Sequence, residues 1–236
     1  MGFFDFLQAQ GNGAFQSLGT AGRTSTRIVH ALLDVPKPER NQVWSEQFLA
    51  HVGNAAFFAR DPCIIQGADM PHFVLHSTPG ALAFPTLVLH HMMDDFLLEQ
   101  GLGVVINPHG QDSDWAFTFG DLLNFHLHGW FYPAEAGEQA PVKPLSAQAR
   151  LPEPARNALR AFLERLGVAA PRVMFAACDH AGPGSLELVF GFSPQEFKSM
   201  DDFRFAMNRI AWFLPRNYSY SVAGIPARQD GGFEPL

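Results

Sequence analysis

The chain has 236 residues, of which 47% are hydrophobic, 17% are charged and 23 are phenylalanine. This composition is typical of a globular protein with one large or two small domains. The net charge of -7, with 16 scattered lysines and arginines, disfavours nucleic-acid binding, which depends on a basic surface. No apolar run approaches the roughly 20 residues that span a bilayer. Because the chain also lacks a secretion signal and has only two cysteines, we expect a cytoplasmic protein.

The first part of the chain alternates between helix-like and strand-like patterns. Residues 1–28 are rich in Gly, Gln, Ser and Thr and predict a flexible N-terminal arm. Apolar residues at helical spacing predict a helix within residues 36–58. Short apolar stretches predict the strands "CIIQ", "HFVLHS", "GVVIN" and "DWAFTF". A helix over residues 86–100 is expected between Pro85 and Gly101, because proline favours the first helical turn and glycine the position after the last.

A capped helix and a proline-rich joint follow. In "TFGDLLNFHLHG", Thr118 is a natural N-cap, Asp121 its capping-box partner and Gly129 the stop, which predicts a helix over 119–128. Residues 132–154 contain five prolines and no apolar period, so we interpret them as a linker. This linker would separate an N-terminal unit over 29–131 from a second unit.

The second unit is expected over residues 155–222, with a flexible tail over 223–236. Its amphipathic first helix ends at Gly167, and "RVMFAAC" and "SLELVFGF" predict a hairpin. Ser199 then caps a second helix. The predicted fold class is therefore α+β, with two small mixed-sheet units and flanking helices, the second in the order helix, strand, strand, helix.

The stretch "LVLHHMMDDFLLEQ" places two histidines and two aspartates in an apolar run. At roughly 100° per residue, Leu89 shares one face with Met92, Met93, Phe96 and Leu97, which we interpret as the core face. The polar side chains point away from that face and predict a solvated surface. The alternative hypothesis is a metal or acid/base site, whose residues would be His90, His91, Asp94 and Asp95.

Other chemical patterns are weaker. On a helix, His126 and His128 diverge by about 200° and cannot share one ion. Cys178 beside His180 ends an apolar strand, where a cysteine is typically a small hydrophobic residue. No GxSxG, Walker A, GxGxxG, HExxH or CxxC motif occurs. We therefore expect no cofactor and no catalytic residue. The sequence leaves open whether His72 or His76 meets His90 or His91.

Two groups of residues remain as candidate binding sites. Asn107, Asp114 and Trp115 lie around a polar turn after a buried strand and before a helix N-terminus, where they would form a shaped rim. Trp212 and Tyr218 lie near the end of the second unit. For both groups the alternative interpretation is structural: local backbone hydrogen bonds for the first, core packing for the second.

The order of these stretches also suggests a family. "GLGVVINP", a short helix, a proline-rich joint, "ALRAFLERLGVAAPRVMFAAC" and "SLELVFGF" follow one another. This order resembles the two-part layout of enhanced serine sensitivity protein B-like (SseB-like) proteins over roughly residues 40–215. That family consists mostly of accessory proteins without an established catalytic centre, so the resemblance implies no active-site residue.

We therefore expect a non-enzymatic accessory protein that binds a protein or peptide through an aromatic-rich cleft or a sheet edge, with homodimerisation as one form of assembly. The alternative is a metal-dependent or His/Asp acid-base enzyme acting on a small molecule.

Overall fold

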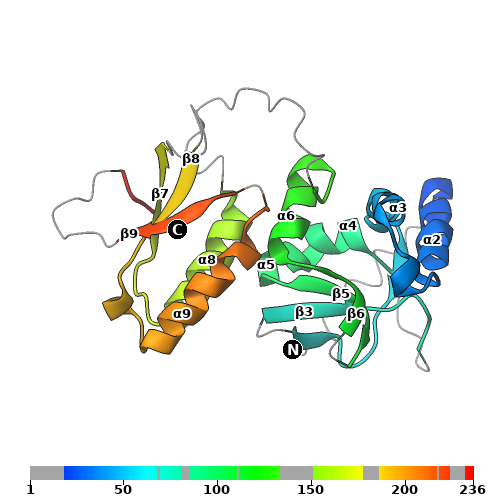
Figure 1. Ribbon diagram of the computed structural model, residues 1–236, viewed down its shortest axis with the longest axis horizontal. Helices are drawn as coiled ribbons and strands as arrows, with labels where there is room; N and C mark the ends of the chain where they lie inside the picture. The colour runs from blue at the N-terminus through cyan, green and yellow to red at the C-terminus, as the bar shows by residue number, and fades with distance from the viewer. Residues whose placement is uncertain are drawn as a thin grey trace. The chain divides into compact units, whose positions relative to one another are not determined.

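The computed structural model describes residues 19–67, 70–80, 86–110, 112–132, 151–177, 186–216, 218–223 and 232–236. These residues form an α+β fold with two four-stranded sheets and one two-stranded sheet (Figure 1), which confirms the predicted fold class. None of their helices is long and apolar enough to cross a membrane. The chain divides into two compact units, Met1–Asp95 with Val104–Ala116 and Phe96–Gly103 with Phe117–Leu236.

The first described helix of the first unit is α2 (Thr20–Leu33), so residues 20–28, expected in a flexible arm, are helical instead. Contacts distant in sequence explain the difference. The Thr26 hydroxyl accepts a hydrogen bond from the Ala56 N–H at 3.0 Å, and His30 Nε2 lies 3.0 Å from the Ala56 carbonyl oxygen. Tertiary hydrogen bonds thus hold polar residues that have little helix propensity of their own. Residues 1–18 of the expected arm lie outside the described residues.

A short 3-10 turn, η1 (Lys37–Glu39), leads to helix α3 (Gln42–Val52), which Asn41 caps by accepting the Trp44 N–H. The helix expected within 36–58 therefore ends at Val52. Strand β1 (Ala56–Phe58) follows and pairs antiparallel with β4 (Thr86–Val88). The second sheet has the order β2 (Ile64–Gly67), β3 (Met70–Leu75), β5 (Gly103–His109) and β6 (Asp112–Phe117).

The helix expected over 86–100 begins only at Leu89, because residues 86–88 form β4. It consists of α4 (Leu89–Met92), a π-helical turn η2 (Met93–Leu97) and α5 (Leu98–Gln100), and ends at Gly101 in the left-handed conformation. All five residues of the predicted core face are buried, and Leu98 is buried with them. The amphipathic prediction is thus confirmed, and the π turn is a feature that it did not contain.

The second unit contains helix α6 (Phe119–His128), which has the predicted capping box of Thr118 and Asp121 and ends at Gly129 in the left-handed conformation. At its first turn the helix touches the backbone near Leu214. A Cβ added to Gly120 would lie 1.9 Å from the Leu214 carbonyl oxygen, so only glycine fits there. The contact places α6 in the second unit, although the sequence placed residues 117–131 in the first.

The predicted order helix, strand, strand, helix is present as α8 (Glu153–Arg165), β7 (Arg172–Ala177), β8 (Leu186–Gly191) and α9 (Met200–Arg209). Strands β7 and β8 pair antiparallel, as predicted for a hairpin. The 3-10 turns η4 (Pro194–Glu196) and η5 (Ile210–Phe213) flank α9. Phe162 of α8 packs against both Phe205 and Phe213, with ring centroids 5.9 and 4.9 Å away.

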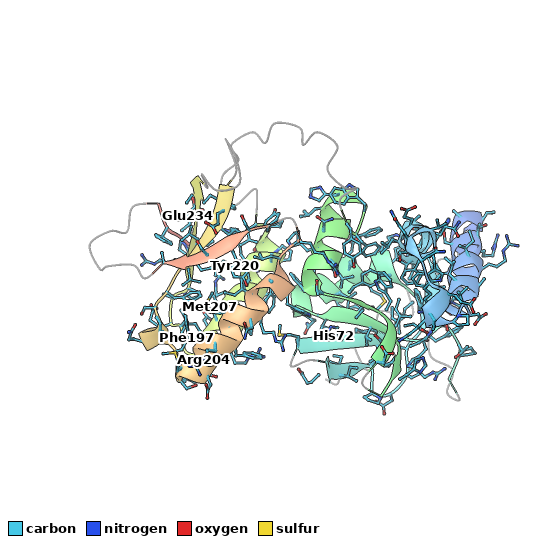
Figure 2. The ribbon with its side chains drawn as sticks, in the orientation of Figure 1. His72, Phe197, Arg204, Met207, Tyr220 and Glu234 are labelled. Atoms are coloured by element: carbon cyan, nitrogen blue, oxygen red, sulfur yellow. The ribbon has the colours of Figure 1, made fainter. Side chains whose placement is uncertain are left out.

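Two further strands make this a mixed four-stranded sheet in the order β10, β7, β8, β9. Strand β9 (Tyr220–Ala223) runs parallel to β8, and β10 (Glu234–Pro235) antiparallel to β7. The Tyr220 hydroxyl donates to the Met207 carbonyl oxygen at 2.9 Å, which ties β9 to α9 (Figure 2). Strand β10 lies within the expected flexible tail. Residues 133–150 of the expected linker lie outside the described residues.

Phenylalanine supplies many of the largest buried side chains in both units. The largest fully buried side chains include Phe48, Phe57, Phe73, Phe117, Phe119, Phe190 and Phe192.

Candidate functional site

Asn107, at the end of β5, links two neighbouring segments of the first unit. Its Oδ1 accepts the Ser77 N–H at 2.9 Å, and its Nδ2 donates to Ser77 Oγ at 3.0 Å and to Asp114 Oδ2 at 2.8 Å. Its φ is +47°, a left-handed conformation that costs most residues roughly 1–2 kcal/mol but that asparagine adopts more readily than most. The side-chain bonds hold the backbone in this conformation.

Asp114 is also held by Arg40. Arg40 Nη2 donates to Asp114 Oδ1 at 2.8 Å, and Nη1 donates to the Asp114 carbonyl oxygen at 3.2 Å. The remaining Arg40 donors reach the carbonyl oxygens of Leu33 and Val35. Both side chains of the pair are largely buried. Arg40 therefore fastens the segment after α2 to strand β6.

Trp115 packs into the same region, with ring centroids 5.7 Å from Trp44 and 5.0 Å from Phe48. The Arg40 guanidinium lies 4.8 Å from the centre of the Trp44 ring. The structure thus brings Asn107, Asp114 and Trp115 together, as the sequence suggested. Most of their polar groups bond to their own unit, which favours the structural interpretation.

Trp212 and Tyr218, the other predicted binding residues, are half-buried in the second unit. The Trp212 ring stacks on Phe119 at 6.2 Å and meets Phe213 edge-on at 5.0 Å. The Tyr218 N–H donates to the Pro215 carbonyl oxygen. Trp212 thus acts mainly as a packing residue.

The four residues of the alternative metal site do not converge as ligands. His90 Nδ1 lies 3.3 Å from the Gly53 carbonyl oxygen, and the His90 ring meets the His91 ring edge-on at 4.0 Å. Asp94 and Asp95 are exposed. Across the described parts of the chain, no group of three or more His, Cys, Asp or Glu residues could hold a metal ion.

The remaining histidines and the cysteines are also placed. His72 is buried, and its Nδ1 donates to the Met70 carbonyl oxygen at 2.9 Å. Burial lowers the pKa of His72, so its neutral form is favoured. Burial raises the pKa of the Cys63 thiol, which disfavours the reactive thiolate. Cys178 and His180 lie outside the described residues.

A surface that the sequence did not single out lies at the C-terminal end of α6. We call it the α6-end surface and define it by Leu127, His128 and Trp130, together with Tyr132 and with Arg216, which bonds to Tyr132 and to Asp121 in the first turn of α6. Leu127 and Trp130 are 39% and 41% exposed, high values for large apolar side chains. The His128 ring stacks on the Trp130 ring at a centroid distance of 5.1 Å. The two rings therefore form one exposed flat face.

Buried side chains hold the backbone of Trp130 and Phe131 beneath this face in place. Asn124, only 1% exposed, donates from Nδ2 to the carbonyl oxygens of Trp130 and Phe131 at 2.8 and 3.2 Å. Phe131 is buried and stacks on both Phe117 and Phe125, with centroid distances of 4.4 and 4.3 Å. Because Phe131 is anchored, the exposed ring of Trp130 starts from a fixed backbone.

Arg216 belongs to the same surface. Its Nε donates to Asp121 Oδ1 at 2.8 Å, and its Nη2 donates to Asp121 Oδ2 at 3.3 Å and to the Tyr132 hydroxyl at 3.1 Å. The guanidinium lies 4.1 Å from the centre of the Tyr132 ring. Although burial opposes it, Asp121 raises the pKa of Arg216 through its hydrogen bonds and charge. Arg216 is thus a fixed cation beside the Tyr132 ring.

The sequence contained a partial signal for this surface. The run "WFY" directly follows the helix stop Gly129, and its alternation of outward, inward and outward side chains is typical of an extended segment. Arg216 could not be found in this way, because it lies 95 residues from Asp121.

Comparisons with known proteins add no assignment: no protein-family model, no curated protein and no solved structure matches this chain.

Proposed function

We propose that this chain is a non-enzymatic accessory protein that binds another protein or a peptide through the α6-end surface. The observation that carries the proposal is Trp130, which is 41% exposed on a backbone held by a buried asparagine. A side chain presented in this way has little conformational freedom to lose on binding. Exposed, fixed tryptophans are the residues on which interfaces most often depend.

The composition of the surface supports the same function. Tryptophan, tyrosine and arginine are enriched among residues that dominate binding energy, and all three are present. Arg216 is oriented by Asp121 and Tyr132, so its cation is also in place before a partner arrives. The resemblance to the SseB-like layout supports an accessory role.

Peptide display against the immobilised full-length protein tests the proposal. The affinity of an enriched peptide is then measured by calorimetry for the wild type and two variants. We expect Trp130→Ala to weaken binding about tenfold or more, since truncating a central tryptophan typically has this effect. Met200→Ala is the matched control, because Met200 is 51% exposed in the same unit but lies on α9. It should leave the affinity unchanged.

Trp130→Ala should still fold, because Asn124 bonds to the backbone carbonyl oxygen of Trp130 and not to its ring. Equal affinity of the wild type and Trp130→Ala would contradict the proposed surface. If the partner is a second copy of the chain, sedimentation will show a dimer that Trp130→Ala dissociates.

A further inference from the structure

Three basic side chains gather at strand ends of the first unit, in what we call the strand-end cluster: Arg60, His76 and His109. Arg60 comes two residues after β1, His76 directly follows β3, and His109 ends β5. Hydrogen bonds between Phe58 and His76, of 2.9 and 2.8 Å, join the first two segments. The bond from the Ser77 N–H to Asn107 Oδ1 joins the second and third.

Each member has hydrogen-bonding capacity that the described residues do not use. Arg60 Nη2 donates to the Thr78 carbonyl oxygen at 2.7 Å, yet Arg60 Nε is buried without an acceptor among the described residues. The half-buried His76 ring makes no hydrogen bond to any residue that the structure describes. His109 Nε2 is 3.8 Å from Asp114 Oδ2, beyond hydrogen-bond distance, and its side chain is 66% exposed.

The charges of the cluster are unbalanced as well. Asp114 lies 3.8 Å from His109 but is already bonded to Arg40 and Asn107, and Asp112, which also interacts with His109, is paired with Lys37. Asp61 directly follows Arg60 but is exposed to solvent. Burial lowers the pKa of His76, and the positive charges of Arg60 and His109 lower it further. The cluster thus repels additional positive charge, and a negative group placed among the three would relieve that repulsion.

We propose that the strand-end cluster binds an oxyanion of the phosphate type, with Arg60, His76 and His109 as donors. A phosphate oxygen accepts charge-assisted hydrogen bonds from a guanidinium group and from histidine N–H groups, and these bonds are stronger than bonds between two neutral groups. The Thr78 hydroxyl, on the same segment as His76, accepts from Arg60 Nη2 at 2.8 Å and keeps its own proton to donate. This inference concerns the first unit and is independent of the function proposed for the α6-end surface.

Nuclear magnetic resonance with a ¹⁵N-labelled full chain tests the proposal. Inorganic phosphate and phosphoserine are added in separate titrations at constant ionic strength, with chloride as the balancing anion. We expect saturable shifts of the backbone amides at residues 59–61, 76–78, 107, 109 and 110, the prolines at 79 and 108 having no N–H. Tighter binding of inorganic phosphate indicates the free ion as the ligand, and tighter binding of phosphoserine indicates a phosphorylated side chain.

Variants locate the site. His109→Gln keeps the fold because His109 is mainly exposed, and Arg60→Gln removes the guanidinium charge. Each should weaken phosphate binding about tenfold, the change expected from one lost charge-assisted bond. His91→Gln, an exposed histidine outside the cluster, should change nothing. If Arg60→Gln fails to fold, His109→Gln and His76→Gln decide. Absent or non-saturable shifts, or equal affinity in the histidine variants, would overturn the proposal.

Discussion

Each unit contains an arginine–aspartate ion pair with a largely buried aspartate, and these two pairs differ in the burial of the arginine. In the second unit Asp121 is 0% exposed while Arg216 is 59% exposed. In the first unit Arg40 and Asp114 are 10% and 11% exposed. Removing one charge of an ion pair is costly mainly when the remaining charge is buried and left without a partner. An arginine–aspartate pair with one buried partner is therefore destabilised mainly by loss of the exposed partner, whereas a pair with two buried partners is destabilised by loss of either.

The largest expected effect on stability comes from removing the arginine partner of the buried Asp121 carboxylate. Arg216→Met leaves this buried carboxylate with the Thr118 N–H as its remaining donor among the described residues. We expect the free energy of unfolding to fall by about 3–5 kcal/mol, as for other broken buried pairs. Asp121→Asn should cost less, because Arg216 can turn to water. Urea denaturation of both variants measures the difference.

The first unit supplies the control for that comparison. Arg40→Met and Asp114→Asn should cost similar amounts, since both members are almost equally buried. If Asp121→Asn proves as harmful as Arg216→Met, the asymmetry of burial does not govern the second pair.

A smaller effect is expected at Asn107, which supports Asp114 in the first pair. Asn107→Ala and Asn107→Gly both remove the bonds to Ser77 and Asp114. Glycine adopts a φ of +47° without steric cost. Alanine should therefore be less stable than glycine by about 1 kcal/mol. Equal urea midpoints and slopes for the two variants would mean that the left-handed backbone is not strained in this way.

The smallest expected effect is a pH dependence confined to the first unit. Because the pKa of His72 is lowered in the folded state, the unfolded chain takes up the proton first as the pH falls below about 6.5. Stability is therefore full above that pH and declines below it until the folded-state pKa is reached. The slope from this residue cannot exceed about 1.4 kcal/mol per pH unit.

Hydrogen exchange at pH 7.5 and 5.5 resolves the two units. His72→Gln should reduce the loss of protection in β3 at the lower pH, whereas His91→Gln, at an exposed position, should not. Equal loss in the wild type and His72→Gln would assign the pH dependence to other groups.

Features set by neighbouring residues could be predicted from the sequence. Thr118 with Asp121, Ser199 with Asp202, and the stop glycines Gly101 and Gly129 all act within a few residues, and the structure contains these caps. The amphipathic face that begins at Leu89 is equally local. Helix α2 was missed because its hydrogen bonds come from Ala56, about 30 residues away.

The candidate sites follow the same division. Asn107 and Asp114 are seven residues apart, and the sequence placed them together. Arg40 and Arg216 lie 74 and 95 residues from Asp114 and Asp121, their respective partners, and no local sequence pattern predicts these pairs. For the same reason the strand-end cluster, which joins three strand ends, became visible only in the fold.

The π turn at Met93–Leu97 changes the angular position around the helix axis of the side chains that follow it. At 100° per residue, Leu98 would lie roughly 180° from Leu89, on the opposite side. A turn closed by bonds to the fifth residue holds about one residue more than an α turn, which brings Leu98 back by roughly 100°. Both leucines are consequently buried. Deleting one residue from this turn would restore regular winding and put Leu98 eight residues after Leu89, again at about 80°, so the turn lets the helix hold an extra residue while its buried face stays continuous.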